Sequence, residues 1–581
     1  MEQGDSQRAA DLLTRQAGAT EAPAERMKLF EALGDMAVMT LHDEARARAC
    51  YEQAVASADP LEAKHLPLLE KLLERQDLAG DNLGAARTAE LMASFGADAG
   101  ARAARYTAAA ESYVAAGDTI KARAASAKAV EADPYDLTAV TVLSDLLLAA
   151  GEHEQAAAVL GRALSSRKDE QNEAAPDDDL TAARRSLLWY RLAEARRARG
   201  DAKGALPAFE KAVALATDSD GAMSARRRLI EIWSEEPARL DTVLEYRRTI
   251  AADSIELEDV AAYARALREA DRTDSAVSML ELAEVLGYAL TEKDRKFLDA
   301  YPPRKLAADE AYRGKLDAAD RAELIADASD QPLGTVLGKL WEAAPLLWSE
   351  PEDALERCMV IGAKRVPASS VLTAAAIFPR VAAALDIPAT MLYATSAPDA
   401  EDVRVVCVSP PIVVLGPRFQ GLDETGWSEL ELRFVLGRAA EMCRPERIIA
   451  MGLPPEDFTA LLDSLARVFG PAGLARSKGD EASKYQDEML RTTLPVKLRG
   501  TITKMLEHLS RADLDPDRYL AACRRAADRA GLLVCGDLTT AVKFAGEMSS
   551  DGRRLDRHLV RTALRPRYLP VRARLGLGAK S

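Results

Sequence analysis

Small residues recur at a fixed distance in the first half of the chain. Gly117, Ala122 and Ala129, in the segment AGDTIKARAASAKAVEADP, each have a counterpart of the same type 34 residues later, in AGEHEQAAAVLGRAL. The apolar positions between them follow helical spacing, interrupted by a glycine and an acidic residue. The period therefore predicts a repeated helix–turn–helix unit.

A third copy and several weaker ones extend this array. The third copy, LLWYRLAEARRARGDAKGALPAFEKAVALA, keeps the same order of positions: Trp189, Leu192, Ala193, Gly200, Ala205, Phe209 and Ala212. Weaker copies contain Ala47, Tyr51 and Ala54, then Gly80, Ala85, Ala89 and Met92, and finally Ala276, Leu280 and Ala283. The pattern closely resembles the tetratricopeptide repeat, which implies an α-solenoid from about residue 10 to about 290.

Each position in the repeat has a physical reason. Small residues such as Ala122, Ala156 and Ala205 are expected where helix A and helix B of one unit cross closely, and larger ones such as Trp189 and Phe209 fill the adjoining space. The glycine that follows helix A supplies a left-handed residue, and the next Asp or Glu begins helix B.

One insertion interrupts the period. Gly151 and Gly200 are 49 residues apart, which exceeds the period by 15 residues. The surplus falls in SSRKDEQNEAAPDDDLTAA, which is polar, acidic and contains Pro176. We interpret it as an extended helix end plus a solvated loop, with a partner-docking loop as the alternative.

Stacked units form a superhelix whose concave side, made by the A helices, is the usual peptide-binding face. The repeat register predicts that this groove contains Thr107, Glu111, Thr141, Asp145, Tyr190, Glu194 and Arg197. Their mixed polarity identifies no ligand, and the alternative for each of them is a surface residue that only maintains solubility. A protein or peptide segment is the expected partner.

The composition changes after about residue 290. Three short runs rich in Val and Ile have the length of strands, at 390–395, 403–409 and 412–416, with Pro410 and Pro411 between the last two. Helices are expected at roughly 426–443, 455–469, 485–509 and 515–531. The sequence thus predicts a mainly α protein: a helical connector at 291–369, an α+β domain with a small sheet at 370–550, and a basic tail at 551–581.

Two fragments of the α+β domain resemble one enzyme family. They are SPPIVVLGPRFQGLDETGWSELELRFVLGRAAEMCRPE and RRAADRAGLLVCGDLTTAVKFA. Together they resemble the HtpX-like zinc metallopeptidases, in which a strand pair leads to a helix carrying H-E-x-x-H and a later helix supplies a Glu four residues before an Asp. The resemblance covers roughly residues 370–550 and implies a metallopeptidase-like fold.

The resemblance also implies that the active site has been lost. It places Arg438 at the first His, Ala439 at the catalytic Glu, Met442 at the second His and Arg524 at the third ligand, with Asp528 preserved. Arginine has no lone pair for a metal, and a thioether is a soft ligand poorly suited to catalytic zinc. We therefore expect a pseudopeptidase that is not an enzyme and binds neither metal nor cofactor.

An alternative assigns a new role to the same residues. Arg438 and Arg524 could converge on the former cleft and bind a carboxylate or phosphate, as an enzyme or an anion-binding sensor would. The competing interpretation, which we favour, is that they form internal ion pairs with Glu441, Asp528 or other carboxylates. No GxxxxGK[ST] loop or GxSxG motif indicates another enzyme class.

Charge and composition narrow the class of protein further. Among 581 residues, 92 Asp and Glu exceed 77 Lys and Arg, which argues against an extended nucleic-acid or lipid-binding surface. The first residues have no apolar signal region, and no apolar run is long enough to span a membrane, so we expect a cytoplasmic protein. Six scattered cysteines without a CxxC spacing predict buried, reduced thiols.

The last thirty residues carry a basic excess in an otherwise acidic chain. Such a run could dock on an acidic surface, including the chain's own solenoid. A solvated end is the interpretation we favour.

These observations favour a scaffold or adaptor, in which the repeats bind a partner segment and the pseudopeptidase domain offers a second docking surface.

Overall fold

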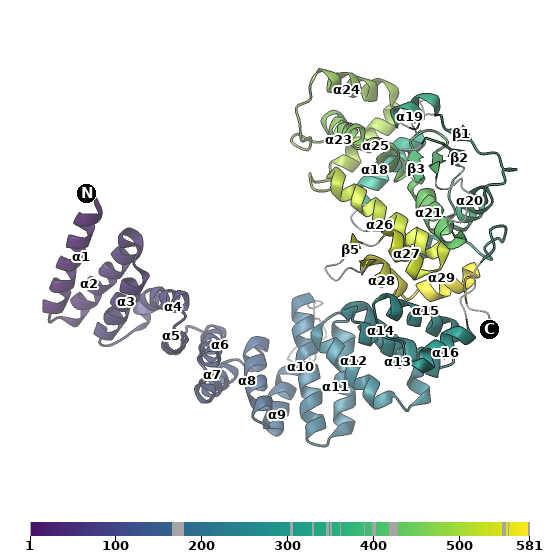
Figure 1. Cartoon of the computed structure of the whole chain (residues 1–581). Helices are drawn as coiled ribbons and strands as arrows, with labels where there is room; N and C mark the ends of the chain where they lie inside the picture. The colour runs from purple at the N-terminus through teal and green to yellow at the C-terminus, as the bar shows by residue number, and fades with distance from the viewer. Residues whose placement is uncertain are drawn as a thin grey trace. The chain divides into compact units, whose positions relative to one another are not determined.

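The structure is a computed structural model in which the chain divides into two compact units, Met1–Pro237 and Ala238–Ser581 (Figure 1). We call these unit 1 and unit 2. The residues that the structure describes are 2–165, 179–301, 306–327, 331–343, 348, 351–358, 360, 362–388, 390–397, 403–417, 428–545, 547–548, 554–555 and 557–578.

Unit 1 is a stack of antiparallel helix pairs. Its helices are α1 (Glu2–Ala19), α2 (Pro23–Met36), η1 (Ala37–Leu41), α3 (Glu44–Ser57), η2 (Ala63–His65), α4 (Leu66–Leu78), α5 (Asn82–Ser94), α6 (Ala99–Ala115), α7 (Thr119–Ala132), α8 (Leu137–Ala149), α9 (His153–Leu164), α10 (Asp179–Ala198), α11 (Ala202–Leu215) and α12 (Asp220–Trp233). A short 3₁₀ turn, η3 (Pro237–Arg239), lies at the junction with unit 2.

The repeat positions have the predicted structural roles. Gly117, Gly151 and Gly200 adopt left-handed φ angles of 77°, 74° and 81° at the ends of the A helices α6, α8 and α10. The carboxylates of Asp118 and Asp201 then accept hydrogen bonds from the first turn of the B helices α7 and α11. The described helix pairs therefore form the tetratricopeptide-type solenoid that the period predicts.

The insertion is partly helical. Its last residues, from Asp179, form the first turn of α10, which makes this helix longer than α6 or α8. The rest of the insertion, 166–178, including Pro176, lies outside the described residues.

The A helices form the inner side of the stack. Successive A helices pack against one another, α6 with α8, α8 with α10 and α10 with α12, whereas contacts between successive B helices are much weaker. A row of helix pairs that is closer on one side curves toward that side. The inner, concave face of unit 1 is therefore made by the A helices, as the repeat pattern predicts.

Overpacking one repeat crossing should destabilise unit 1. Ala156 on α9 is fully buried, whereas Ala158 on the same helix is exposed. We expect Ala156→Trp to lower the free energy of unfolding by about 1–3 kcal/mol or more, because its ring has no space between the paired helices. Thermal unfolding followed by circular dichroism measures the loss. Ala158→Trp is the matched control, and equal melting curves for the two variants would contradict the repeat register.

Unit 2 contains further helices and two small sheets. The helices are α13 (Leu240–Ser254), α14 (Leu257–Glu269), α15 (Thr273–Val285), α16 (Glu292–Ala300), α17 (Ala318–Leu324), α18 (Gln331–Ala343), α19 (Pro351–Arg357), α20 (Thr373–Ala384), α21 (Glu429–Met442), α22 (Ile448–Gly452), α23 (Pro455–Phe469), α24 (Glu481–Thr493), α25 (Val496–Leu506), α26 (Pro516–Cys535), α27 (Leu538–Ala545), α28 (Arg557–Ala563) and α29 (Tyr568–Leu575). The strands are β1 (Lys364–Arg365), β2 (Met391–Ala394), β3 (Val403–Val406), β4 (Ile412–Leu415), β5 (Glu547–Met548) and β6 (Arg554–Leu555).

The division between the units falls earlier than the expected boundary near residue 290. The repeat-like helices α13, α14 and α15 share one hydrophobic core with the C-terminal half of the chain, from Leu244 to Leu577. Ala276, Leu280 and Ala283, the predicted repeat positions of α15, are fully buried in that core. The spacing in the sequence shows that these residues follow the repeat pattern. It does not show which other helices bury them.

The main sheet has the strand order β1-β2-β4-β3. β2 and β4 are parallel, and the outer strands β1 and β3 run antiparallel to their neighbours. The three predicted strand runs all contribute, with β4 buried along its whole length. β1 comes from the segment expected to be a helical connector, so the sheet begins before residue 370.

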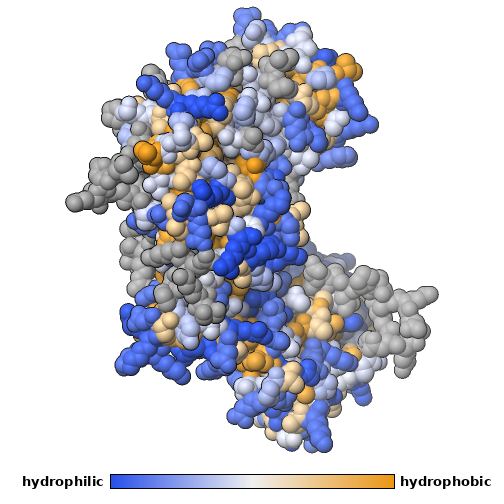
Figure 2. Space-filling model, turned by 90° about the vertical axis from the view of Figure 1, so that its right-hand side faces the viewer, coloured by the Kyte–Doolittle hydropathy of each residue, from blue (hydrophilic) through white to orange (hydrophobic). Residues whose placement is uncertain are grey.

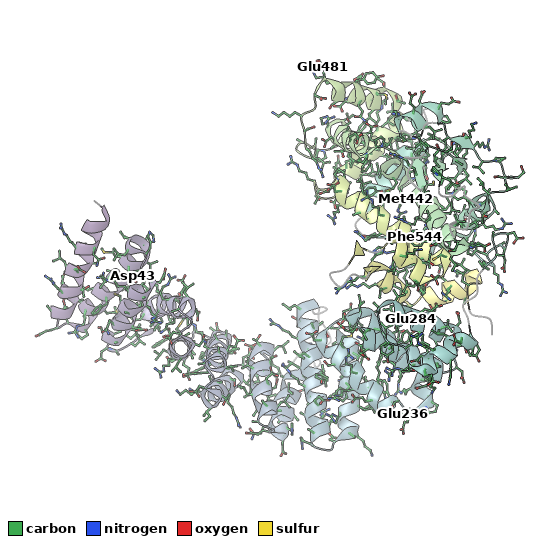
Figure 3. The ribbon with its side chains drawn as sticks, in the orientation of Figure 1. Asp43, Glu236, Glu284, Met442, Glu481 and Phe544 are labelled. Carbon is green, nitrogen blue, oxygen red and sulfur yellow. The ribbon has the colours of Figure 1, made fainter. Side chains whose placement is uncertain are left out.

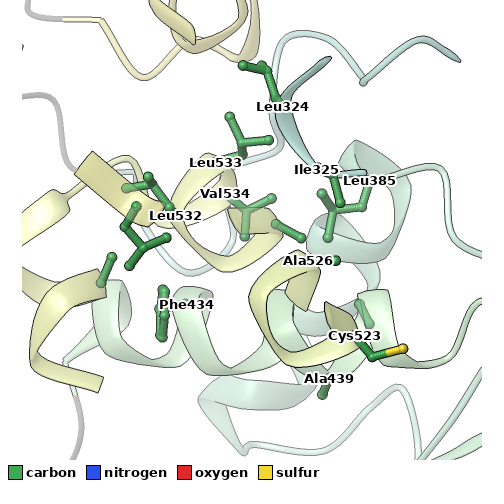
Figure 4. Close-up of a cluster of buried hydrophobic side chains, with 14 of the residues drawn as sticks. Leu324, Ile325, Leu385, Phe434, Ala439, Cys523, Ala526, Leu532, Leu533 and Val534 are labelled. Carbon is green, nitrogen blue, oxygen red and sulfur yellow. The ribbon is translucent and has the colours of Figure 1, made fainter. Parts of the chain in front are cut away.

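The core of unit 2 is built around α21 and α26 (Figure 4). Phe434 of α21 and Ala526, Leu532 and Val534 of α26 are all within 2% of complete burial. The helices approach so closely that a Cβ on Gly531 would lie 2.7 Å from the Phe434 carbonyl oxygen. Glycine is therefore required at this crossing.

The basic C-terminal segment is not a solvated tail, which corrects the interpretation favoured from sequence. α28 and α29 pack into unit 2, and Tyr568, Val571 and Leu575 are almost completely buried. Arg567 and Arg574 form ion pairs with the buried Asp320, and Arg572 lies 3.9 Å from Asp274 of α15. These contacts to distant carboxylates explain why the basic residues are found in a folded segment.

Glu281 on α15 should make the stability of unit 2 depend on pH. Burial raises the pKa of this carboxyl to about 7, although the nearby Arg572 guanidinium opposes the shift; Asp537, Asp274 and Glu284 reinforce it. Because the pKa is higher in the folded than in the unfolded protein, this group lowers stability increasingly as pH rises from about 4.5 through 7.

We therefore expect Glu281→Gln to raise the free energy of unfolding by about 1–3 kcal/mol at pH 8 and to leave it unchanged near pH 4. Urea unfolding at both pH values measures this difference. Glu292→Gln, at an exposed carboxyl on α16, is the control. A Glu281→Gln effect that is equal at both pH values would contradict the shifted pKa.

Candidate functional site

The candidate site lies on α21, which is fixed by its ends and by its crossing with α26. Ser428 and Glu431 form a reciprocal capping box at the start of α21. Asp515 caps α26, and Gly536 ends it with a left-handed φ of 67°. These local signals fix where the side chains of both helices point.

Three of the predicted degenerate positions line one cavity. Arg438, Ala439 and Met442 lie within about one helical turn on α21 and border a cavity of about 280 Å³. Its other walls are apolar side chains from the edge strand β3, from α21 and from α27: Val403, Val405, Val435 and Phe544. Met442 and Phe544 are both labelled in Figure 3, one above the other.

The two predicted positions on α26, Asp528 and Arg524, differ in their burial. Asp528 is buried, and its carboxylate Oδ1 lies 2.6 Å from Nε of Arg438. Arg524, four residues earlier on α26, is exposed and does not border the cavity. The structure thus brings Arg438, Ala439, Met442 and Asp528 together, and it leaves Arg524 exposed outside the cavity.

The ion pair of Arg438 matches the internal-pair interpretation rather than a two-arginine clamp. The Arg438 guanidinium also lies over the ring of Phe434, 5.8 Å from its centroid. Glu441, the other acid proposed as a partner of Arg438, instead pairs with Arg321 at 2.6 Å and Arg447 at 2.8 Å. Glu441 is completely buried, so these two arginines neutralise a carboxylate inside the core.

Sequence reasoning did not identify Arg321 and Arg447 as partners of Glu441. Arg447 lies six residues after Glu441, beyond the end of the same helix, and Arg321 lies 120 residues earlier. Neither separation corresponds to neighbouring positions on one helix, so only the tertiary structure shows that these side chains meet. We call Arg321, Glu441 and Arg447 the triad.

The groove positions of unit 1 are partly corrected. Thr107 is 4% exposed, and its hydroxyl donates to the Ala103 carbonyl, so it belongs to the packing of α6 and not to the groove surface. Thr141 is half-buried and donates in the same way to Leu137. A threonine hydroxyl on a helix readily bonds the carbonyl one turn earlier, so its proton is already used within the helix.

The remaining groove positions carry charged and aromatic side chains. Glu111 is exposed, Asp145 pairs with Arg191 of the next A helix at 2.7 Å, and Tyr190 packs against Phe209 with ring centroids 6.0 Å apart. Glu194 pairs with Arg197 of α10 at 2.9 Å and with Arg228 of α12 at 3.2 Å.

Ion pairs thus link successive A helices along the inner face. Arg191 and Arg228, which the sequence analysis did not select, are the basic partners in these links. Arg228 could have been found from the period, because it lies 34 residues after Glu194.

No group of three or more His, Cys, Asp or Glu side chains that could hold a metal ion occurs among the described residues. In the same part of the chain, no helix is long and apolar enough to cross a membrane. All six cysteines are buried.

No family model matches the chain, and no curated protein matches it. Similar solved structures include a tetratricopeptide repeat protein from Parabacteroides merdae, with 14% identity over 47% of this chain and 97% of that chain and a TM-score of 0.26. BtubC (BKLC) from P. vanneervenii has 18% identity over 37% of this chain and 89% of that chain, with a TM-score of 0.23. The TPR domain of P58(IPK) has 12% identity over 51% of this chain and 97% of that chain, with a TM-score of 0.17. Because these identities and TM-scores are low, the assignment of the solenoid rests on the helix pairs themselves.

Proposed function

We propose that the protein is a non-catalytic interaction scaffold that binds a segment of a partner protein on the inner face of unit 1. The observation that carries this proposal is the stack of A helices, whose inner face presents charged and aromatic side chains that the core does not require. Solenoids of this kind stay rigid through contacts between neighbouring repeats and therefore offer a long preformed surface.

The chemistry of this face suits a mixed-charge peptide. Glu111 is exposed on α6, and Arg197 is 48% exposed on α10. The side chains of the Asp145 and Glu194 ion pairs are partly exposed, from 15% for Arg191 to 51% for Asp145, so a partner's charged groups can reach and replace them. Recognition would depend on the order of charges along the groove.

We further propose that the α+β part of unit 2 is a pseudopeptidase that serves as a second docking surface. The side chains of Arg438, Ala439 and Met442, at the positions that the metallopeptidase resemblance assigns to ligands and base, support this proposal because none of them can bind a catalytic zinc or activate water. A cytoplasmic location and the absence of cofactor and nucleic-acid partners belong to the same proposal.

The alternative, an enzyme or an anion sensor that uses Arg438 together with Arg524, receives less support. Arg524 is exposed and does not border the cavity, so the two arginines do not converge on one anion there.

Affinity capture with matched charge variants tests the groove. Glu111→Lys with Arg197→Glu reverses two charges on the A helices, and Glu154→Lys with Lys203→Glu reverses the same charges on the exposed B-helix positions of α9 and α11. We expect a set of proteins that the parent and the B-helix variant retain equally, and that the groove variant retains about tenfold less. Equal retention by all three proteins, measured by quantitative mass spectrometry, would contradict binding in the groove.

A further inference from the structure

The cavity beside Arg438 combines apolar walls with one incompletely used guanidinium. Among the described residues, seven line it, and six of these have apolar side chains: Val403, Val405, Val435, Ala439, Met442 and Phe544. Arg438, the seventh, is 27% exposed and is the one charged residue among these described lining residues.

The ion pair with Asp528 leaves the two terminal nitrogens of the Arg438 guanidinium available to a ligand. Its Nε faces Asp528 at 2.6 Å, so the ion pair uses the inner edge of the guanidinium. A guanidinium has five N–H donors, and the two terminal nitrogens provide four of them as a planar fork that fits a carboxylate. The pair with Asp528 and the contact with the Phe434 ring hold this fork in a fixed orientation.

The size of the cavity limits the ligand. A volume of about 280 Å³ is at the lower end of the range for small-molecule sites, so it accommodates a compact molecule of roughly a dozen non-hydrogen atoms. The apolar walls favour a hydrocarbon portion, and the ring of Phe544 favours an aromatic one.

We propose that this cavity binds a small monocarboxylate with an apolar or aromatic tail, the tail lying between β3 and α21 and the carboxylate accepting hydrogen bonds from the terminal nitrogens of Arg438. Met442, in place of a polar side chain, makes the cavity wall flexible and apolar, as a site for such a tail requires. This binding site is separate from the groove of unit 1.

Three probes separate the contributions of charge and tail: 3-phenylpropanoate, its neutral amide 3-phenylpropanamide, and acetate. With the full-length protein in isothermal titration calorimetry, we expect 3-phenylpropanoate to bind at least about tenfold more tightly than either of the others, because a charge-assisted hydrogen bond and burial of the ring each contribute at least that factor. Equal affinities for the acid and the amide, or no binding of 3-phenylpropanoate, would overturn the proposal.

Three variants test whether 3-phenylpropanoate binds in this cavity. Ala439→Leu fills the cavity while leaving Arg438 and Asp528 intact, so it should abolish binding of 3-phenylpropanoate. The double variant Arg438→Gln with Asp528→Asn removes both charges together and should abolish the preference for acid over amide. Arg524→Gln, an exposed arginine outside the cavity, is the control and should bind like the parent protein.

Unfolding curves verify that each variant is folded before titration. If the double variant does not fold, Ala439→Leu alone decides the location, and its binding 3-phenylpropanoate like the parent would overturn the proposal.

Discussion

Replacing Glu441 with glutamine should lower the free energy of unfolding of unit 2 by about 3–5 kcal/mol, the largest loss that we expect from a single conservative substitution. Glu441 is completely buried, and its two oxygens each contact a different guanidinium, that of Arg321 and that of Arg447. Glutamine has almost the same shape but no charge. The two arginines, themselves 17% and 8% exposed, would then lose the buried negative charge that Glu441 places between them.

Chemical denaturation of the full-length protein, followed by tryptophan fluorescence, measures this loss. Glu429→Gln, an exposed acid in the first turn of the same helix, is the control and should cost at most a few tenths of a kcal/mol. Replacing the whole triad with apolar residues, as Arg321→Met, Glu441→Leu and Arg447→Met, should recover part of the stability, since an apolar core avoids the cost of desolvating charges. A Glu441→Gln variant as stable as Glu429→Gln would contradict the burial of this triad.

Introducing the metallopeptidase motif at the four positions that the sequence resemblance assigns to it should create a zinc site at this place. The four changes are Arg438→His, Ala439→Glu, Met442→His and Arg524→Glu. Positions 438 and 442 lie one helical turn apart and border the same cavity, so two imidazoles placed there would face one another. Asp528, retained next to position 438, would orient one imidazole through a hydrogen bond.

We expect the four-residue variant to bind about one zinc ion per chain, and the variant without Arg524→Glu to bind about 10–100-fold more weakly. Competition with a chromophoric chelator measures both affinities. Equal zinc affinity with and without the change at position 524 would mean that the exposed α26 position cannot supply a ligand, and it would contradict the pseudopeptidase proposal.

The helical repeats could be predicted well because each unit needs the same local residues. Close helix crossings require small residues such as Ala156, and each turn requires a left-handed glycine such as Gly151, so the period is visible in the sequence. The strand runs were predicted for a similar reason: short Val-rich segments bounded by Pro have few other uses. The expected helix at 485–509 is divided into α24 and α25 at Leu494 and Pro495, where proline cannot continue the first helix.

Features that depend on distant partners could not be predicted. The chain divides at Pro237 and not near residue 290, because α27 and the C-terminal helices bury the apolar side chains of α15. The basic C-terminal segment was expected to be solvated because its carboxylate partner Asp320 is some 250 residues away in sequence. Thr107 was assigned to the groove from its register alone, which does not show that a hydroxyl bonds within its own helix.

The candidate cavity was predictable only in part. The sequence resemblance assigns Arg438, Ala439 and Met442 to nearby positions on one helix. The same alignment places Asp528 on the partner helix and so allows its ion pair with Arg438. The walls contributed by β3 and by Phe544 of α27 depend on packing between elements, so the apolar side chains that surround Arg438 are recognised only in the structure.

The central claim is that the inner face of unit 1 holds a partner protein, and site-specific photo-crosslinking tests it most directly. A photoreactive phenylalanine derivative would replace Glu111 on the A helix α6 or, as the control, Glu154 on the B helix α9, both of which are exposed. After irradiation of living cells, we predict a discrete crosslinked species from position 111 and none from position 154. No crosslink at position 111, or the same products from both positions, would contradict the claim.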